Sequence, residues 1–67
     1  MTARLQGVIK ERIEAQNKIT ALEKFIHGPT FHSVDVAEQD RIKLQLKVTQ
    51  QLEQVLSDRI SYSLEAA

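Results

Sequence analysis

Apolar residues recur along this chain at alternating intervals of three and four positions, in two segments of similar length. In the first segment the repeat consists of Leu5, Val8, Arg12, Ala15, Ile19, Leu22 and Ile26, and Ile9 and Ile13 broaden it. This spacing places the side chains on one face of a helix, as in a packed helical pair. The pattern therefore predicts a helix over about residues 3–27.

A turn over residues 28–35 separates the two segments, and it opens with Gly28-Pro29. Glycine suits a left-handed residue just past a helix end, and proline does not continue a helix. Asp35 and Glu38 have the spacing of a capping box, in which each side chain satisfies a free amide at a helix start. We therefore expect the second helix to cover about residues 36–62.

The stretch from Ile42 to Val48 alternates apolar and polar residues, which on its own is typical of a strand. It lies between a strong helix start and a helix-rich segment, with no glycine or proline, so we interpret it as helical. Two apolar stripes then lie side by side on the second helix. One consists of Ile42, Leu46, Leu52, Leu56, Ile60 and Leu64, and the other of Leu44, Val48, Val55 and Tyr62.

The predicted fold is all-α: an antiparallel two-helix hairpin, as a single domain over residues 1–67, assembling into a homo-oligomeric helical bundle. Oligomerisation is expected because the apolar arc of the second helix spans about 200°, which one neighbouring helix does not cover. Folding near residue 31 places Arg12 opposite Glu53 and Glu23 near Arg41. The same fold makes Phe25 and Phe31 the plug of the turn end.

Composition excludes several functional classes. The 67 residues contain no cysteine and two histidines, which removes disulfides and makes a zinc site improbable. Nine basic residues balance nine acidic ones, so no positive field favours DNA or an anionic membrane. The sequence also lacks a phosphate-binding glycine loop and a catalytic constellation, so we expect neither an enzyme nor a cofactor.

Four residues are candidates for binding an anionic ligand: Lys24, His27, Thr30 and Arg59. Lys24 lies in the last predicted turn of the first helix, where it either stabilises the negative helix end or contacts a phosphate together with a neighbouring subunit. Arg59 borders the apolar arc of the second helix. It is either an interface arginine that covers apolar surface with its stem or a ligand-binding arginine.

A longer pattern supports a family resemblance. It comprises Lys18-Ile19-x-Ala21-Leu22-x-Lys24-Phe25-Ile26, then Phe31, Gln45-Leu46 and Val55-Leu56-x-x-Arg59-Ile60. The chain thereby resembles small helical-hairpin proteins of phages and prophages that are related to anti-CBASS and Thoeris anti-defence sponges. The resemblance implies a helical oligomer in the host cytoplasm that binds a cyclic di- or trinucleotide without hydrolysing it. It also implies a phosphate-binding lysine followed by a threonine, for which Lys24 and Thr30 are the candidates.

Two functional hypotheses follow from the sequence. The first is a phage counter-defence protein that sequesters cyclic oligonucleotide immune signals. The second is a small interaction protein that binds and inhibits a host or phage protein through its exposed apolar stripe. Neither hypothesis involves DNA or a membrane.

Overall fold

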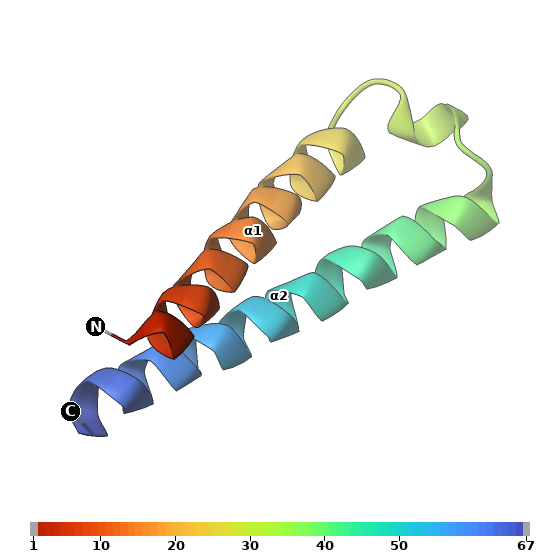
Figure 1. Cartoon of the computed structure of the whole chain (residues 1–67). Helices are drawn as coiled ribbons and strands as arrows, with labels where there is room; N and C mark the ends of the chain where they lie inside the picture. The colour runs from red at the N-terminus through yellow and green to blue at the C-terminus, as the bar shows by residue number, and fades with distance from the viewer. Residues whose placement is uncertain (1, 67) are drawn as a thin grey trace.

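The computed structural model describes residues 2–66, so the two ends of the expected domain, residues 1 and 67, lie outside this range. It contains helix α1 (Ala3–Ile26), a short 3-10 helix η1 (Phe31–Ser33) and helix α2 (Val36–Ala66). The two long helices run antiparallel and form a rod measuring 49 × 14 × 14 Å (Figure 1). The predicted all-α hairpin is confirmed, and the strand-like stretch at 42–48 is helical.

The turn starts with a tight helix end. The amide of Gly28 donates a hydrogen bond to the carbonyl of Phe25 at 3.1 Å. Gly28 does not have the positive φ that we expected. Its role is steric instead, because a Cβ atom there would lie 3.1 Å from the carbonyl oxygen of Lys24 and 3.3 Å from that of Phe25. The turn therefore uses glycine for close backbone approach.

Helix α2 begins at Val36, as predicted, but its first turn makes other contacts than expected and its end lies further along the chain. The side-chain amide of Gln39 donates to the carbonyl of Val34 at 2.7 Å. Glu38, the second member of the expected capping box, forms an ion pair with Arg41 at 3.7 Å. At its other end α2 continues past residue 62 to Ala66, because no glycine or proline interrupts the last turn.

The buried core is small and lies toward the end of the hairpin that carries both termini. It consists of Val8, Ala15, Leu56 and Ile60, with Leu5 and Ile9 packed against it. The helices diverge toward the turn (Figure 1). Along the diverging part, the inward residues Ile19, Leu22, Ile42 and Leu46 are half-buried.

Phe31 closes the turn end, as predicted, and is only 2% exposed. Its ring meets the ring of Phe25 edge-on, with centroids 6.0 Å apart and an interplanar angle of 86°. The ammonium of Lys43 lies 5.7 Å from the Phe31 centroid, within the range of a cation–π contact. Phe31 therefore links the end of α1, the turn and the first half of α2.

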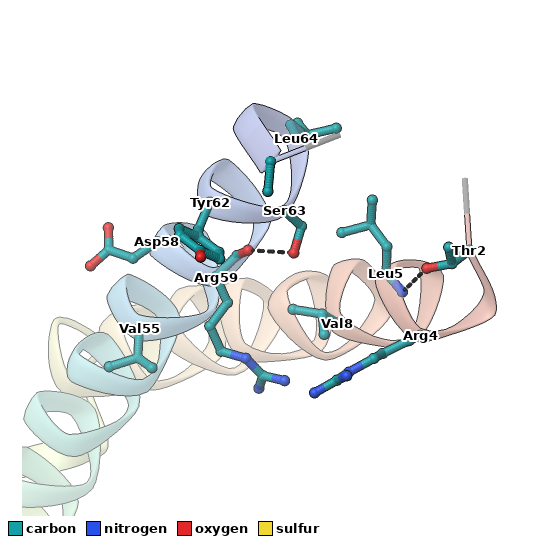
Figure 2. A pocket seen from close by; sticks show the side chains of 11 residues that line it. Thr2, Arg4, Leu5, Val8, Val55, Asp58, Arg59, Tyr62, Ser63 and Leu64 are labelled. Atoms are coloured by element: carbon teal, nitrogen blue, oxygen red, sulfur yellow. Dashed lines mark hydrogen bonds between the residues drawn. The ribbon is translucent and has the colours of Figure 1, made fainter.

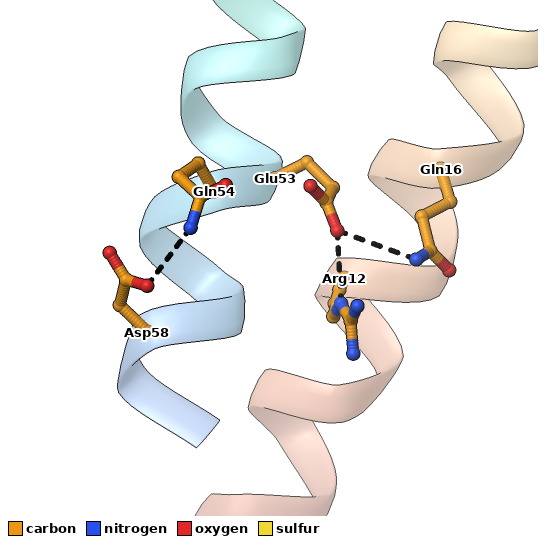
Figure 3. A network of polar contacts seen from close by, with 5 residues as sticks. All are labelled: Arg12, Gln16, Glu53, Gln54 and Asp58. Carbon is orange, nitrogen blue, oxygen red and sulfur yellow. Dashed lines mark hydrogen bonds and ion pairs between the residues drawn. The ribbon is translucent and has the colours of Figure 1, made fainter. Parts of the chain in front are cut away.

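The predicted register is confirmed at its central ion pair (Figure 3). Arg12 Nε lies 3.0 Å from Glu53 Oε1, and the side-chain amide of Gln16 donates to the same oxygen at 3.4 Å. The second expected pair is wrong, because Arg41 binds Glu38 on its own helix and not Glu23.

The inward face of α2 also differs from the prediction at two positions. Leu52 is 49% exposed and Leu64 is 59% exposed. Leu52 lies at the margin of the face, where Glu53 points inward to Arg12 instead. In the Arg12–Glu53 register, Ala3 at the start of α1 falls opposite residue 62, so Leu64 lies beyond the end of α1. The second apolar stripe, formed by Leu44, Val48, Val55 and Tyr62, is exposed throughout.

We predict that Glu53→Arg lowers the free energy of unfolding by about 1 kcal/mol, because it replaces the register-setting ion pair with two like charges. Adding Arg12→Glu should recover most of that loss, as measured by urea denaturation at one protein concentration. Glu14→Arg, a charge reversal on the outer face of α1, is the matched control. A double variant no more stable than Glu53→Arg alone would contradict the assigned role of the pair.

We predict that Phe31→Ala lowers the free energy of unfolding by about 3 kcal/mol, because it leaves a cavity between the diverging helices. Phe25→Ala should cost clearly less, since the Phe25 side chain is already 39% exposed. Thermal unfolding followed by circular dichroism compares the two variants. Equal losses would show that Phe31 is not the anchor of the turn.

Candidate functional site

An open groove of about 1020 Å³ lies at the end of the hairpin that carries the two termini (Figure 2). We call it the terminal groove. It is lined by Thr2, Arg4, Leu5 and Val8 from the start of α1 and its cap, and by Val55, Asp58, Arg59, Tyr62, Ser63, Leu64 and Ala66 from α2. The groove exists only in the folded hairpin, because its two walls come from opposite ends of the sequence.

Two arginines give the terminal groove a local positive charge in a molecule of zero net charge. The guanidinium groups of Arg4 and Arg59 point toward the same side of the groove (Figure 2). Among residues 2–66 the ion pairs involve Arg12 and Arg41 and neither of these two arginines. Each guanidinium group presents a planar set of N–H donors whose geometry fits phosphate or carboxylate, so this side of the groove is a candidate site for an anion.

One carboxylate also lines the terminal groove. The side chain of Asp58 extends away from the two guanidinium groups (Figure 2). One of its oxygens accepts a hydrogen bond from the side-chain amide of Gln54 at 3.0 Å (Figure 3). Its position leaves the guanidinium side of the groove accessible to an anion.

The remaining wall of the terminal groove is apolar and aromatic. Tyr62 is 73% exposed, and Val55 and Leu64 beside it are more than half exposed. A flat, accessible phenol ring can stack on a planar ligand group such as a nucleobase. The groove therefore combines anion-binding donors with an aromatic surface.

The structure separates the four residues that the sequence analysis selected. Lys24 lies in the last turn of α1, His27 is the C-cap residue of that helix, and Thr30 precedes η1, so these three lie at the turn end. Arg59 lies in the terminal groove instead. The two ends are about 30 Å apart, the axial rise from residue 4 to residue 24 of α1. A single chain thus does not bring all four residues to one site.

Sequence reasoning missed Arg4 as a site residue. The signal that could have found it is the hairpin register itself. Because Arg12 lies opposite Glu53, the residue eight positions earlier, Arg4, falls opposite residue 61. That position is between Arg59 and Ser63, both of which line the terminal groove.

Neither a metal-binding cluster nor a membrane-spanning helix is present in the part of the chain that the structure describes. Between residues 2 and 66, no group of three His, Cys, Asp or Glu side chains is arranged to hold a metal ion. Neither α1 nor α2, over the residues described, is long and apolar enough to cross a membrane.

Fold and groove together define a small α-helical hairpin with a groove lined by basic and aromatic residues at the end that carries the termini. Comparison with known families identifies it further. Residues 2–62 match the family model described as Sequestin, and the chain belongs to that family. No curated protein and no solved structure matches the chain.

We predict that Arg4→Gln and Arg59→Gln each leave the free energy of unfolding within about 0.5 kcal/mol of the original protein. Neither side chain forms an ion pair among residues 2–66, so its loss should cost the fold little. Thermal unfolding at fixed concentration measures the effect. A loss of about 3 kcal/mol or more, the scale for breaking a buried charge pair, would mean that these arginines stabilise the hairpin and are not free to contact a ligand.

Proposed function

We propose that this protein sequesters cyclic oligonucleotide immune signals, as a phage counter-defence protein, by binding them without hydrolysing them. The observation that carries the proposal is the meeting of Arg4, Arg59 and Tyr62 at one groove. The name of the Sequestin family, to which the chain belongs, also favours sequestration.

The chemistry of the ligand class fits that of the terminal groove. A cyclic di- or trinucleotide presents anionic phosphodiesters and flat bases around one ring. Arg4 and Arg59 would bind phosphodiester oxygens through charge-assisted hydrogen bonds, the stronger class of such bonds. The ring of Tyr62 would stack on a base, a contact that contributes about 1–3 kcal/mol per base in single-stranded nucleic-acid binding.

A second group of basic and polar residues extends the proposal. Lys24, His27 and Thr30 lie at the turn end, about 30 Å from Arg59 along the rod. They would contribute to the same ligand only from a neighbouring subunit, in a pocket shared between copies. In that arrangement the homo-oligomer, and not the single hairpin, is the complete binding unit.

The proposal is tested by isothermal titration of the purified protein with a panel of cyclic di- and trinucleotides. At least one ligand should bind with a fixed stoichiometry and be recovered with unchanged mass after heat denaturation of the protein. Recovery of a linear product would contradict sequestration. Absence of heat at micromolar protein for the whole panel would contradict nucleotide binding and favour the interaction-protein hypothesis, which rests on the exposed apolar stripe.

We predict that Arg4→Gln or Arg59→Gln weakens the binding of that ligand about 10- to 100-fold, the range for loss of a hydrogen bond to a charged group. Tyr62→Phe should bind nearly as well as the original protein, whereas Tyr62→Ala should weaken binding by about tenfold, because stacking needs the ring and not the hydroxyl. Lys10→Gln, on the outer face of α1, is the matched control and should bind normally. Equal affinity of all variants would exclude the terminal groove as the ligand site.

A further inference from the structure

Helix α2 exposes more large apolar side chains than it buries. Leu56 and Ile60 are its buried residues, whereas Leu44, Val48, Leu52 and Val55 are 49–60% exposed along its middle. Exposed apolar surface of this continuity is typical of a protein interface. Four half-exposed apolar side chains over three turns therefore give α2 a second apolar face, which no other described part of the hairpin covers.

That second face has a heptad spacing of its own. Positions at alternating intervals of three and four run along the side of α2 that faces away from α1, and we call them the outer stripe: Arg41, Leu44, Val48, Gln51, Val55 and Asp58. All six residues are exposed. This is the spacing of a coiled-coil seam, with a base at one end, an acid at the other, and three aliphatic residues and Gln51 between them.

The outer stripe is complementary to itself when one copy is reversed. In an antiparallel pair with its two-fold axis between Thr49 and Gln50, Arg41 packs opposite the partner's Asp58. In the same register Leu44 packs opposite the partner's Val55, and Val48 opposite the partner's Gln51. The two-fold symmetry repeats each layer, so one register pairs the charges at both ends and sets Leu44 against the partner's Val55.

A flanking position agrees with this register. Glu38 and Arg59 lie on the same edge of the stripe, so the reversed partner brings Glu38 to within two residues, about 3 Å of helical rise, of the level of the partner's Arg59. Arg41 already binds Glu38 within its own chain at 3.7 Å. Each end of the pair would therefore hold two acids and two bases in one cluster. A parallel pair has the opposite outcome, because it sets Arg41 against the partner's Arg41 and Asp58 against the partner's Asp58, which is unfavourable.

We propose that the outer stripe of α2 binds a second copy of this chain, antiparallel, with the two-fold axis between Thr49 and Gln50. The charge complementarity selects a second copy over an unrelated protein, since one surface supplies both halves of every pair. The dimer forms without a ligand and stands independently of the proposed function.

The dimer also affects the terminal groove, a consequence that rests on the proposed function. Val55 and Asp58 belong both to the outer stripe and to the lining of the groove, so the partner's α2 covers that side of the groove. Arg59 and Tyr62 lie just past the last layer, so the rest of each groove is bordered by the first turn of the partner's α2. The five N–H donors of Arg59 allow it to contact the partner's Glu38 and an anion together. The pair would thus carry two equivalent sites, one at each end, both next to a partner's turn.

Cysteine crosslinking tests the geometry directly, because the chain contains no cysteine of its own. Positions 44 and 55 are 11 residues apart in the sequence, about 16 Å along one helix, too far for an internal disulfide. The double variant Leu44→Cys/Val55→Cys should oxidise to a closed covalent dimer. Neither single variant should crosslink, since position 44 meets the partner's position 55 and not its own equivalent. Efficient crosslinking of either single variant would overturn the antiparallel register.

Exchanging the charges at positions 41 and 58 gives a second test of the dimer, one that needs no cysteine. Sedimentation equilibrium should show that Arg41→Glu raises the dissociation constant of the dimer at least about tenfold. The exchange variant Arg41→Glu/Asp58→Arg should return it to within about threefold of the original, and Lys10→Glu on α1 should not change it. Circular dichroism verifies that each variant is helical. A monomeric original protein at 100 µM, roughly the weak end of specific association, or an exchange variant as weak as Arg41→Glu, would overturn the proposal.

Discussion

The ion pair between Arg12 and Glu53 fixes how the two helices slide against each other, and the other features depend on that alignment. Apolar seams with a three-four repeat tolerate shifts by a whole heptad, because every shift still sets apolar residues against apolar residues. A charged pair within the seam removes that freedom, since a shift would leave both charges facing apolar surface. Gln16 strengthens the constraint by donating to the same carboxylate oxygen.

That alignment has consequences at both ends of the rod. At one end it brings Arg4 opposite residue 61, beside Arg59, and forms the terminal groove. At the other end the helices diverge, and Phe31 from the turn fills the space between them. An aromatic plug therefore fills the diverging turn end, whereas at the end that carries the termini the helices are packed together and basic and aromatic side chains are accessible beside them.

A hairpin of this size buries few residues, and the small core helps to explain the distribution of its apolar surface. Below about 70–80 residues, a single core rarely supplies much stability, and small domains without disulfides or metals commonly rely on self-association. Here the buried residues of α2 face α1, while a second apolar face, bounded by Arg41 and Asp58, points outward. The outward face and the terminal groove share one helix. A partner on that face would therefore lie next to any ligand in the groove, which connects assembly with binding.

The apolar periodicity and the helix-ending Gly28-Pro29 pair were sufficient to predict the hairpin, its helical content and the Arg12–Glu53 pair, because these depend on spacing along the chain. Local geometry was less predictable. Gly28 avoids a clash with a carbonyl rather than adopting a positive φ, and Glu38 binds Arg41 rather than completing a capping box. Such choices are decided by contacts worth about 1 kcal/mol, for which several partners compete. The spacing of residues within one helix did not predict the groove, because Arg4 and Arg59 come together only when the chain folds back on itself. The order of the residues determines which segments form helices. Which side chains share a groove depends on how the two helices are aligned in space.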